Sequence, residues 1–175
     1  MASRSYTSRR EMVESSFHPL ITLLVPLLAI LLGAYLPRLF PRLMILDLPL
    51  IVVVFFAVAR RSPIAGTFTG AIVGLLQDSL SNQPIGVNGM VKALVGYMAA
   101  SIGLNVNVDS LTTRLVMNFG FSLLGSGLIF LIERRLLGFT TYQVMWMHEL
   151  ARAGVNTLVA VPVFLLLDRT KVQEN

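Results

Sequence analysis

Two ionisable side chains, Asp78 and Lys92, flank one short turn between long apolar runs of the sequence. A carboxylate or an ammonium group inside a bilayer costs about 2.5–3.5 kcal/mol on insertion scales, so both groups are expected to find partners within the protein. The sequence predicts that Asp78 is held by Lys92, or by the backbone amides at the start of the next helix, where the helix dipole is positive. The alternative is a solvated carboxylate at a loop end.

Side-chain combinations typical of enzymes are missing from the sequence. Histidine occurs only as His18 and His148, which stand far apart at polar edges, and there is no cysteine. The sequence therefore lacks Cys-ligated metal sites, disulfides, a Ser-His-Asp set, phosphate loops and dinucleotide fingerprints. An enzyme needs an activated nucleophile or a paired acid and base, and only Asp78 and Lys92 come near this. We expect neither a cofactor nor a metal, and an intramembrane enzyme is the least favoured function class.

Composition places most of the chain in lipid. Of its 175 residues, 55% are apolar and only 13% are charged, whereas a soluble domain carries roughly 25% charged residues. The apolar residues form blocks long enough to span a bilayer. The predicted spans are Leu20–Leu36, Leu43–Ala59, Pro63–Leu80, Ile85–Leu104, Leu111–Ile132 and Leu150–Leu167. The predicted fold is therefore an all-α, polytopic integral membrane bundle of six transmembrane helices.

Arginines at the ends of these blocks predict the topology. We expect a cytoplasmic N-terminal segment (1–19), a transmembrane domain (20–168) and a cytoplasmic tail (169–175), because the very short Arg60-Arg61 turn marks the cytoplasmic side. Arg38, Arg42, Arg134 and Arg135 fall on the other side and disagree with this orientation. The net charge of +5 suits anionic headgroups, and without a basic stripe it does not indicate nucleic acid.

Small residues recur on three neighbouring predicted helices, where they would let helix backbones touch in lipid. They are Gly66, Gly70 and Gly74; then Gly89, Ala93, Gly96, Ala100 and Gly103; and then Gly120, Ser122 and Ser126. The first two faces belong to helices joined by a short turn, which favours packing inside the bundle over dimerisation. The third face is the candidate interface for a partner helix.

Two connecting segments carry further predictions. In the turn before the fourth span, Gly86 allows backbone crowding and Asn88 is predicted to cap the helix. The loop Glu133–Glu149 contains aromatic and methionine residues, which suit anchoring at the headgroup level or, alternatively, an adaptable docking surface. Its beginning, the charged run at residues 133–135, is predicted to be an interfacial charge belt.

Several motifs together resemble the MreD family of bacterial rod shape-determining proteins. They are Asp47-Leu48-Pro49, the Arg60-Arg61 turn, the glycine ladder through Gly74-Leu75-Leu76-Gln77-Asp78, Pro84-Ile85-Gly86, Gly96-Tyr97, and the run from Asn156 through Pro162 to Arg169. The resemblance covers most of the chain. Its central part, from the glycine ladder to the turn, is the most specific part.

The resemblance implies a non-enzymatic subunit of the cell-wall elongation machinery in the bacterial cytoplasmic membrane. Its expected partners are the transmembrane helix of MreC, through it MreB, RodA and a class B penicillin-binding protein, and membrane lipids. The family fold is similar to the substrate-binding components of energy-coupling-factor vitamin transporters. The alternative function is therefore a small-ligand or lipid pocket between the Asp78 turn and the Glu133–Glu149 loop, with Asp78, Asn88 and Lys92 as its polar groups.

Overall fold

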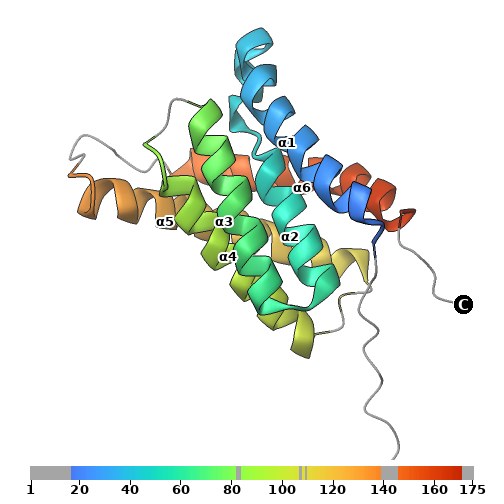
Figure 1. The fold of residues 1–175 in the computed structure, drawn as a ribbon. Coiled ribbons are helices and arrows are strands. Elements are labelled where there is room, and N and C mark those ends of the chain that lie inside the picture. The colour runs from blue at the N-terminus through green and yellow to red at the C-terminus, as the bar shows by residue number, and fades with distance from the viewer. Residues whose placement is uncertain (1–16, 82–83, 107, 109, 139–145, 171–175) are drawn as a thin grey trace, which may run out of the picture.

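The computed structural model describes residues 17–81, 84–106, 108, 110–138 and 146–170, and Figure 1 shows its helices. The helices are α1 (Pro19–Leu39), the 3-10 helix η1 (Pro41–Ile45), α2 (Leu48–Arg60), α3 (Pro63–Leu80), α4 (Val87–Asn105), α5 (Leu111–Arg135) and α6 (Trp146–Asp168). This arrangement confirms the predicted all-α bundle with six α-helices in the described part of the chain. Most of the N-terminal segment, most of the tail and the aromatic residues Phe139 and Tyr142 lie outside the described residues.

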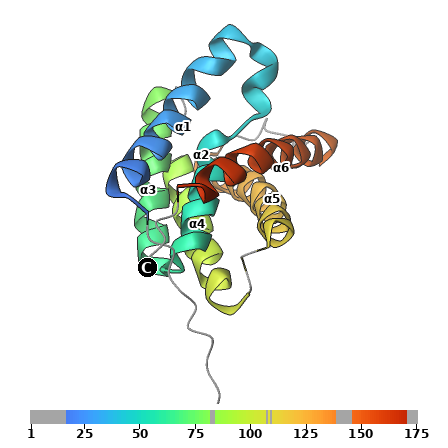
Figure 2. The ribbon, with the colours of Figure 1, turned by 90° about the vertical axis from the view of Figure 1, so that its right-hand side faces the viewer.

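Helix α2 is the centre of the bundle. It contacts each of the other five α-helices, and every residue from Pro49 to Ala59 is buried. Figure 2 shows α2 and α4 between α1 and α3 on one side and α5 and α6 on the other. A helix that is apolar on all sides must be enclosed by protein or lipid. Here protein encloses α2, which leaves the surrounding helices to meet the lipid.

The start of α2 differs from the prediction of one continuous span over Leu43–Ala59. The chain instead forms the separate 3-10 helix η1 and then begins α2 at Leu48. The side chain of Asp47 caps this start by accepting a hydrogen bond from the backbone N–H of Leu50 at 3.1 Å. Pro49 occupies the first turn of α2, where its missing N–H costs nothing. A polar cap therefore stands at this point within an apolar sequence.

The turn from α2 to α3 follows the local sequence closely. Arg61 ends α2 in the left-handed conformation with a φ of 53°. The hydroxyl of Ser62 caps α3 by accepting from the backbone N–H of Ala65 at 3.4 Å, and Pro63 is the first helical residue. So short a connection forces α2 and α3 to run antiparallel. The predicted bounds of α3, Pro63 and Leu80, are those observed.

Within the described part of the chain, five segments are long and apolar enough to cross a membrane: α1, η1 with α2, α4, α5 and α6. Helix α3 is not among them, because its glycines and its polar end lower its apolar content. Most of the leucines of α1 are exposed, as expected for a surface that meets acyl chains. Trp146, at the start of α6, is 75% exposed. An exposed tryptophan at a helix end is typical of the membrane–water interface.

Helices α5 and α6 form a hairpin, which crosses behind the other four helices in Figure 1. An ion pair ties them together near the end of α6. The guanidinium of Arg114 donates to both carboxylate oxygens of Asp168, at 2.8 and 2.7 Å. The same guanidinium lies 5.8 Å from the ring centre of Phe55 and 5.9 Å from that of Phe164. This bidentate pair therefore also fixes the hairpin against α2.

Candidate functional site

The glycine ladder of α3 lies directly against the backbone of α4. A Cβ atom at Gly66 would overlap the backbone of Gly96, and a Cβ atom at Gly70 would overlap the carbonyl of Lys92. At Gly74 it would overlap the carbonyl of Asn88. Only glycine permits this approach, which is the internal packing that the sequence predicts. The close contact brings the polar end of α3 to the start of α4.

Asp78 is buried at this junction, with 1% of its surface exposed. Its carboxylate accepts hydrogen bonds from the backbone N–H groups of Gly86 at 2.9 Å, and of Asn88 and Gly89 at 3.3 Å each. The side-chain amide of Asn88 donates a fourth bond at 2.8 Å. Of the two predicted ways to hold Asp78, the amides at the helix start are correct. The predicted cap is wrong, because Gly86 is the N-cap of α4 and Asn88 bridges to other side chains.

Lys92 has a different partner from the one predicted. Its ammonium nitrogen lies 3.0 Å from Oδ2 of Asp47 and 3.0 Å from Oδ1 of Asn88. The predicted pairing with Asp78 is therefore wrong, and in the described part of the chain the amide of Asn88 links the two residues. Lys92 is fully buried. Its long side chain reaches from α4 to the start of α2, whereas Asp78 is already supplied with donors by its own turn.

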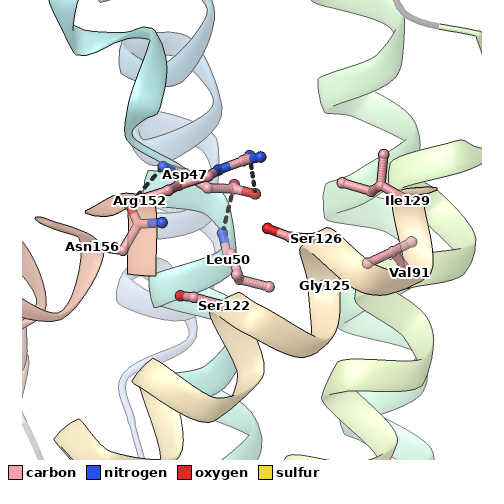
Figure 3. A pocket seen from close by; sticks show the side chains of 9 residues that line it. All are labelled: Asp47, Leu50, Val91, Ser122, Gly125, Ser126, Ile129, Arg152 and Asn156. Atoms are coloured by element: carbon pink, nitrogen blue, oxygen red, sulfur yellow. Dashed lines mark hydrogen bonds and ion pairs between the residues drawn. The ribbon is translucent and has the colours of Figure 1, made fainter. Parts of the chain in front are cut away.

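Asp47 joins α2 to α6 as well as to α4. Besides capping α2, it donates its own backbone N–H to Oδ1 of Asn156 at 2.9 Å. The guanidinium of Arg152 lies 3.8 Å from the Asp47 carboxylate and 3.9 Å from that of Glu149. Figure 3 shows Arg152 and Asn156 of α6 converging on Asp47. The Asp47 carboxylate thus faces two cations, Lys92 and Arg152.

We call Asp47, Asp78, Asn88, Lys92 and Asn156 the buried polar network. None of the five is more than 8% exposed, and together they belong to the start of α2 and to α3, α4 and α6. Buried ion pairs add little net stability over apolar packing, but removing one partner leaves a costly isolated charge. A helix that rotated about its axis or slid along it would leave such a charge without its partner. The network therefore selects one arrangement of four elements.

The candidate interface residues on α5 face in different directions. Ser122 is buried and Ser126 is half-buried, and both line a small cavity beside Asp47 (Figure 3). This cavity has a volume of about 10 Å³, roughly the room that one water molecule requires. Gly120 is exposed, and no described atom lies within 4 Å of the position that a Cβ atom would take. Of the three residues, only Gly120 lies on the outer surface.

A much larger cavity opens on the other side of the network. Its volume is about 900 Å³, and its walls come from the ends of α1, α3 and α5, from η1, and from the starts of α4 and α6. Asn88 and Arg152 link its wall to the buried polar network, and Glu133 and Glu149 add carboxylates. The cavity lies where the alternative function places a pocket, between the Asp78 turn and the end of α5 with the start of α6. We call this cavity the large cavity.

Comparison with protein families gives a match over residues 14–170, to the family described as rod shape-determining protein MreD. The chain belongs to the MreD family. The matched segment contains all six helices, the glycine ladder and the whole buried polar network. Neither the curated proteins nor the solved structures gave a match to this chain. The expected likeness to vitamin-transporter components therefore stays a prediction.

Membership of the MreD family establishes a role in rod-shape determination, and with the apolar helices it makes the chain a multi-pass membrane protein. The geometry agrees with a structural role for the buried polar network. Its charges are paired with each other or with backbone amides. Among the described residues, no group of three histidine, aspartate or glutamate side chains is placed to hold a metal ion.

Sequence reasoning missed three polar residues of this MreD-family bundle: Arg152, Asn156 as a partner of Asp47, and Glu133. Asp47 and Asn156 stand in the motifs on which the resemblance to the family rests, but nothing in their local sequence identifies the partner of either residue. Arg152 had a signal that could have been used, since an arginine at the third position of a predicted membrane span indicates a partner. Glu133 was interpreted as part of a charge belt, yet it is buried, with 8% exposed.

Proposed function

We propose that this chain is a non-enzymatic scaffold subunit of the cell-wall elongation machinery, which binds MreC and so supports lateral peptidoglycan synthesis. MreB, RodA and a class B penicillin-binding protein would be reached through MreC. The observation that carries this proposal is the buried polar network, in which the scarce charges serve to fix helices against one another. A catalytic site would instead direct such groups at a substrate. Membership of the MreD family, with its role in rod shape, supports the same reading.

The proposed location is the bacterial cytoplasmic membrane, with both termini in the cytoplasm. Arginines before α1 and the Arg60-Arg61 turn support this orientation by the positive-inside tendency. An even number of spans brings both ends of the chain to one side of the membrane. In this orientation the large cavity faces the periplasm. The outer face of the helices remains available to the transmembrane helix of MreC.

The partner surface that we favour is the outer face of α5 around Gly120. Gly127, two turns further along α5, is also exposed, and no described atom lies within 4 Å of its Cβ position. Lipid offers no hydrophobic drive for helix association, so close backbone packing over small residues supplies the attraction. Ser122 and Ser126 face inward and would support the partner helix only indirectly. The MreC helix is therefore expected to cross α5 over its two open glycines.

Replacement of Gly120 by leucine tests this proposal. Gly120→Leu should lower co-purification of MreC about fivefold or more, because contacts of this kind contribute about 1–2 kcal/mol. Gly154→Leu is the matched control, since Gly154 of α6 likewise has open space at its Cβ position. Both variants should keep wild-type levels in the membrane. Equal MreC recovery from all three proteins would remove α5 from the interface, and loss with Gly154→Leu alone would move the interface to α6.

A further inference from the structure

The large cavity lies at one end of the bundle, and the ends of transmembrane helices are where membrane proteins meet lipid headgroups. Helices α1, α3 and α5 end at its wall, and α4 and α6 begin there. Its volume of about 900 Å³ falls within the range of small-molecule pockets, about 300–1,000 Å³. Apolar side chains such as Met44, Leu80 and Ile129 line it together with charged ones. A ligand that fits this wall has both a charged head and an apolar part.

Glu133 is the buried charged group of this wall that has no counter-charge among the described residues. Glu133 is 8% exposed, and none of the ion pairs between the described residues includes its carboxylate. The other carboxylate of the cavity, that of Glu149, already lies 3.6 Å from His148 and 3.9 Å from Arg152. A carboxylate that is largely removed from water and reaches it only through the cavity is poorly stabilised without a counter-charge. A ligand that brings an ammonium group to Glu133 supplies this counter-charge.

Two arginines of the same cavity have the opposite charge and remain accessible. Arg38 and Arg42 both line the cavity and are exposed. The polar contact of Arg38 is a long one, 3.5 Å to the backbone carbonyl of Leu80. Guanidinium groups are the side chains best matched to phosphate oxygens, which they bind through two parallel hydrogen bonds. The cavity thus combines one buried carboxylate, that of Glu133, with two exposed guanidinium groups, those of Arg38 and Arg42.

We propose that the large cavity binds a ligand whose head carries both a primary ammonium and a phosphate ester. The ammonium pairs with Glu133, the phosphate with Arg38 and Arg42, and the apolar wall contacts the adjoining chains. A zwitterionic phospholipid such as phosphatidylethanolamine has this chemistry and reaches the cavity from the membrane. Soluble phosphoethanolamine has the same head without the chains. This inference goes beyond the scaffold function and does not depend on it.

Native mass spectrometry of the purified full chain, with added lipids of identical acyl chains, tests the proposal. Phosphatidylethanolamine should bind about tenfold more tightly than phosphatidylcholine, whose trimethylated amine cannot donate to Glu133, because charged hydrogen bonds contribute about 1.5–3 kcal/mol. Glu133→Gln should abolish this preference while leaving phosphatidylcholine binding unchanged. A double variant, Arg38→Gln with Arg42→Gln, should weaken both lipids alike. Arg134→Gln, at an exposed neighbour outside the cavity wall, is the control.

The outcomes separate the sources of the ligand. Displacement of the lipid by excess soluble phosphoethanolamine, with much weaker binding of the latter, supports the membrane lipid. Binding of phosphoethanolamine without any lipid keeps the head chemistry and rejects the lipid source. Equal affinity of the wild type for phosphatidylethanolamine and phosphatidylcholine overturns the proposal. That comparison needs no variant, so it stands even if Glu133→Gln folds poorly, which gel filtration and circular dichroism would reveal.

Discussion

Replacing Lys92 by methionine would isolate the buried charge of Asp47 at the start of α2. The ammonium of Lys92 makes two hydrogen bonds of 3.0 Å, to Asp47 and to Asn88, and Lys92 is fully buried. Methionine has a similar stem, so the packing around it is kept while both bonds are lost. Asp47 retains its cap to Leu50 and a second cation, Arg152, at 3.8 Å. The change therefore tests the buried ion pair itself.

The expected loss of unfolding free energy is about 3 kcal/mol. Hydrogen bonds to charged groups contribute about 1.5–3 kcal/mol each, so the two bonds give roughly 3–6 kcal/mol. Arg152 offsets part of the remaining charge of Asp47, which places the expectation at the lower end. Breaking a buried ion pair from one side typically costs about 3–5 kcal/mol. The expected loss is well above the average of about 0.6 kcal/mol for interhelical polar contacts in membranes.

A double-mutant cycle provides the assay. Asp47→Asn keeps the oxygen that caps Leu50 but removes the charge, so the double variant has neither charge of the pair. Unfolding of the purified protein with increasing sodium dodecyl sulfate, followed by circular dichroism, gives the four free energies. We expect the double variant to be about 2 kcal/mol more stable than the sum of the single losses predicts. Additive losses, or a loss below about 0.5 kcal/mol for Lys92→Met, would refute a functional pairing of these charges.

Two further substitutions probe the same region. Gly70→Ala places a methyl group against the backbone of α4 and should cost at least about 2 kcal/mol in the same unfolding assay, whereas the control Gly154→Ala, in open space, should cost nothing. Asp78→Asn presents an amide donor to N–H groups that need an acceptor, so membrane insertion should remain at the wild-type level while stability falls by about 2 kcal/mol. Wild-type stability of Asp78→Asn would mean that the carboxylate is solvated at a loop end.

Local sequence was sufficient for most of the fold. Apolar blocks located the six helices, and Ser62-Pro63 located the start of α3. The break before α2 was missed although Asp47 and Pro49 are a good capping pair, because the apolar pattern runs across it from Leu43. The apolar pattern favours one continuous helix from Leu43, whereas the Asp47 cap favours a helix that begins at Leu48. The structure follows the cap.

The site was predictable only where its partners lie close in the chain. Asp78 and the amides that hold it are 8 to 11 residues apart, so the turn itself indicates the contact. Lys92 and Asp47 are 45 residues apart, and their meeting depends on the rotation and axial position of α4 against α2. No local pattern encodes these two quantities. Glu133 was misplaced for the same reason, since its burial depends on how α5 crosses its neighbours.

The long separation of Asp47 and Lys92 bears on how the protein is made. A ribosome adds about 5–20 residues per second, so the 45 residues between them take about 2 to 9 seconds to synthesise. During that interval the aspartate stands at the head of α2 without the lysine that later neutralises it. Arrival of α4 is thus the step at which the nascent chain can first close its core, and a ribosomal pause before Lys92 would prolong exposure of an uncompensated charge.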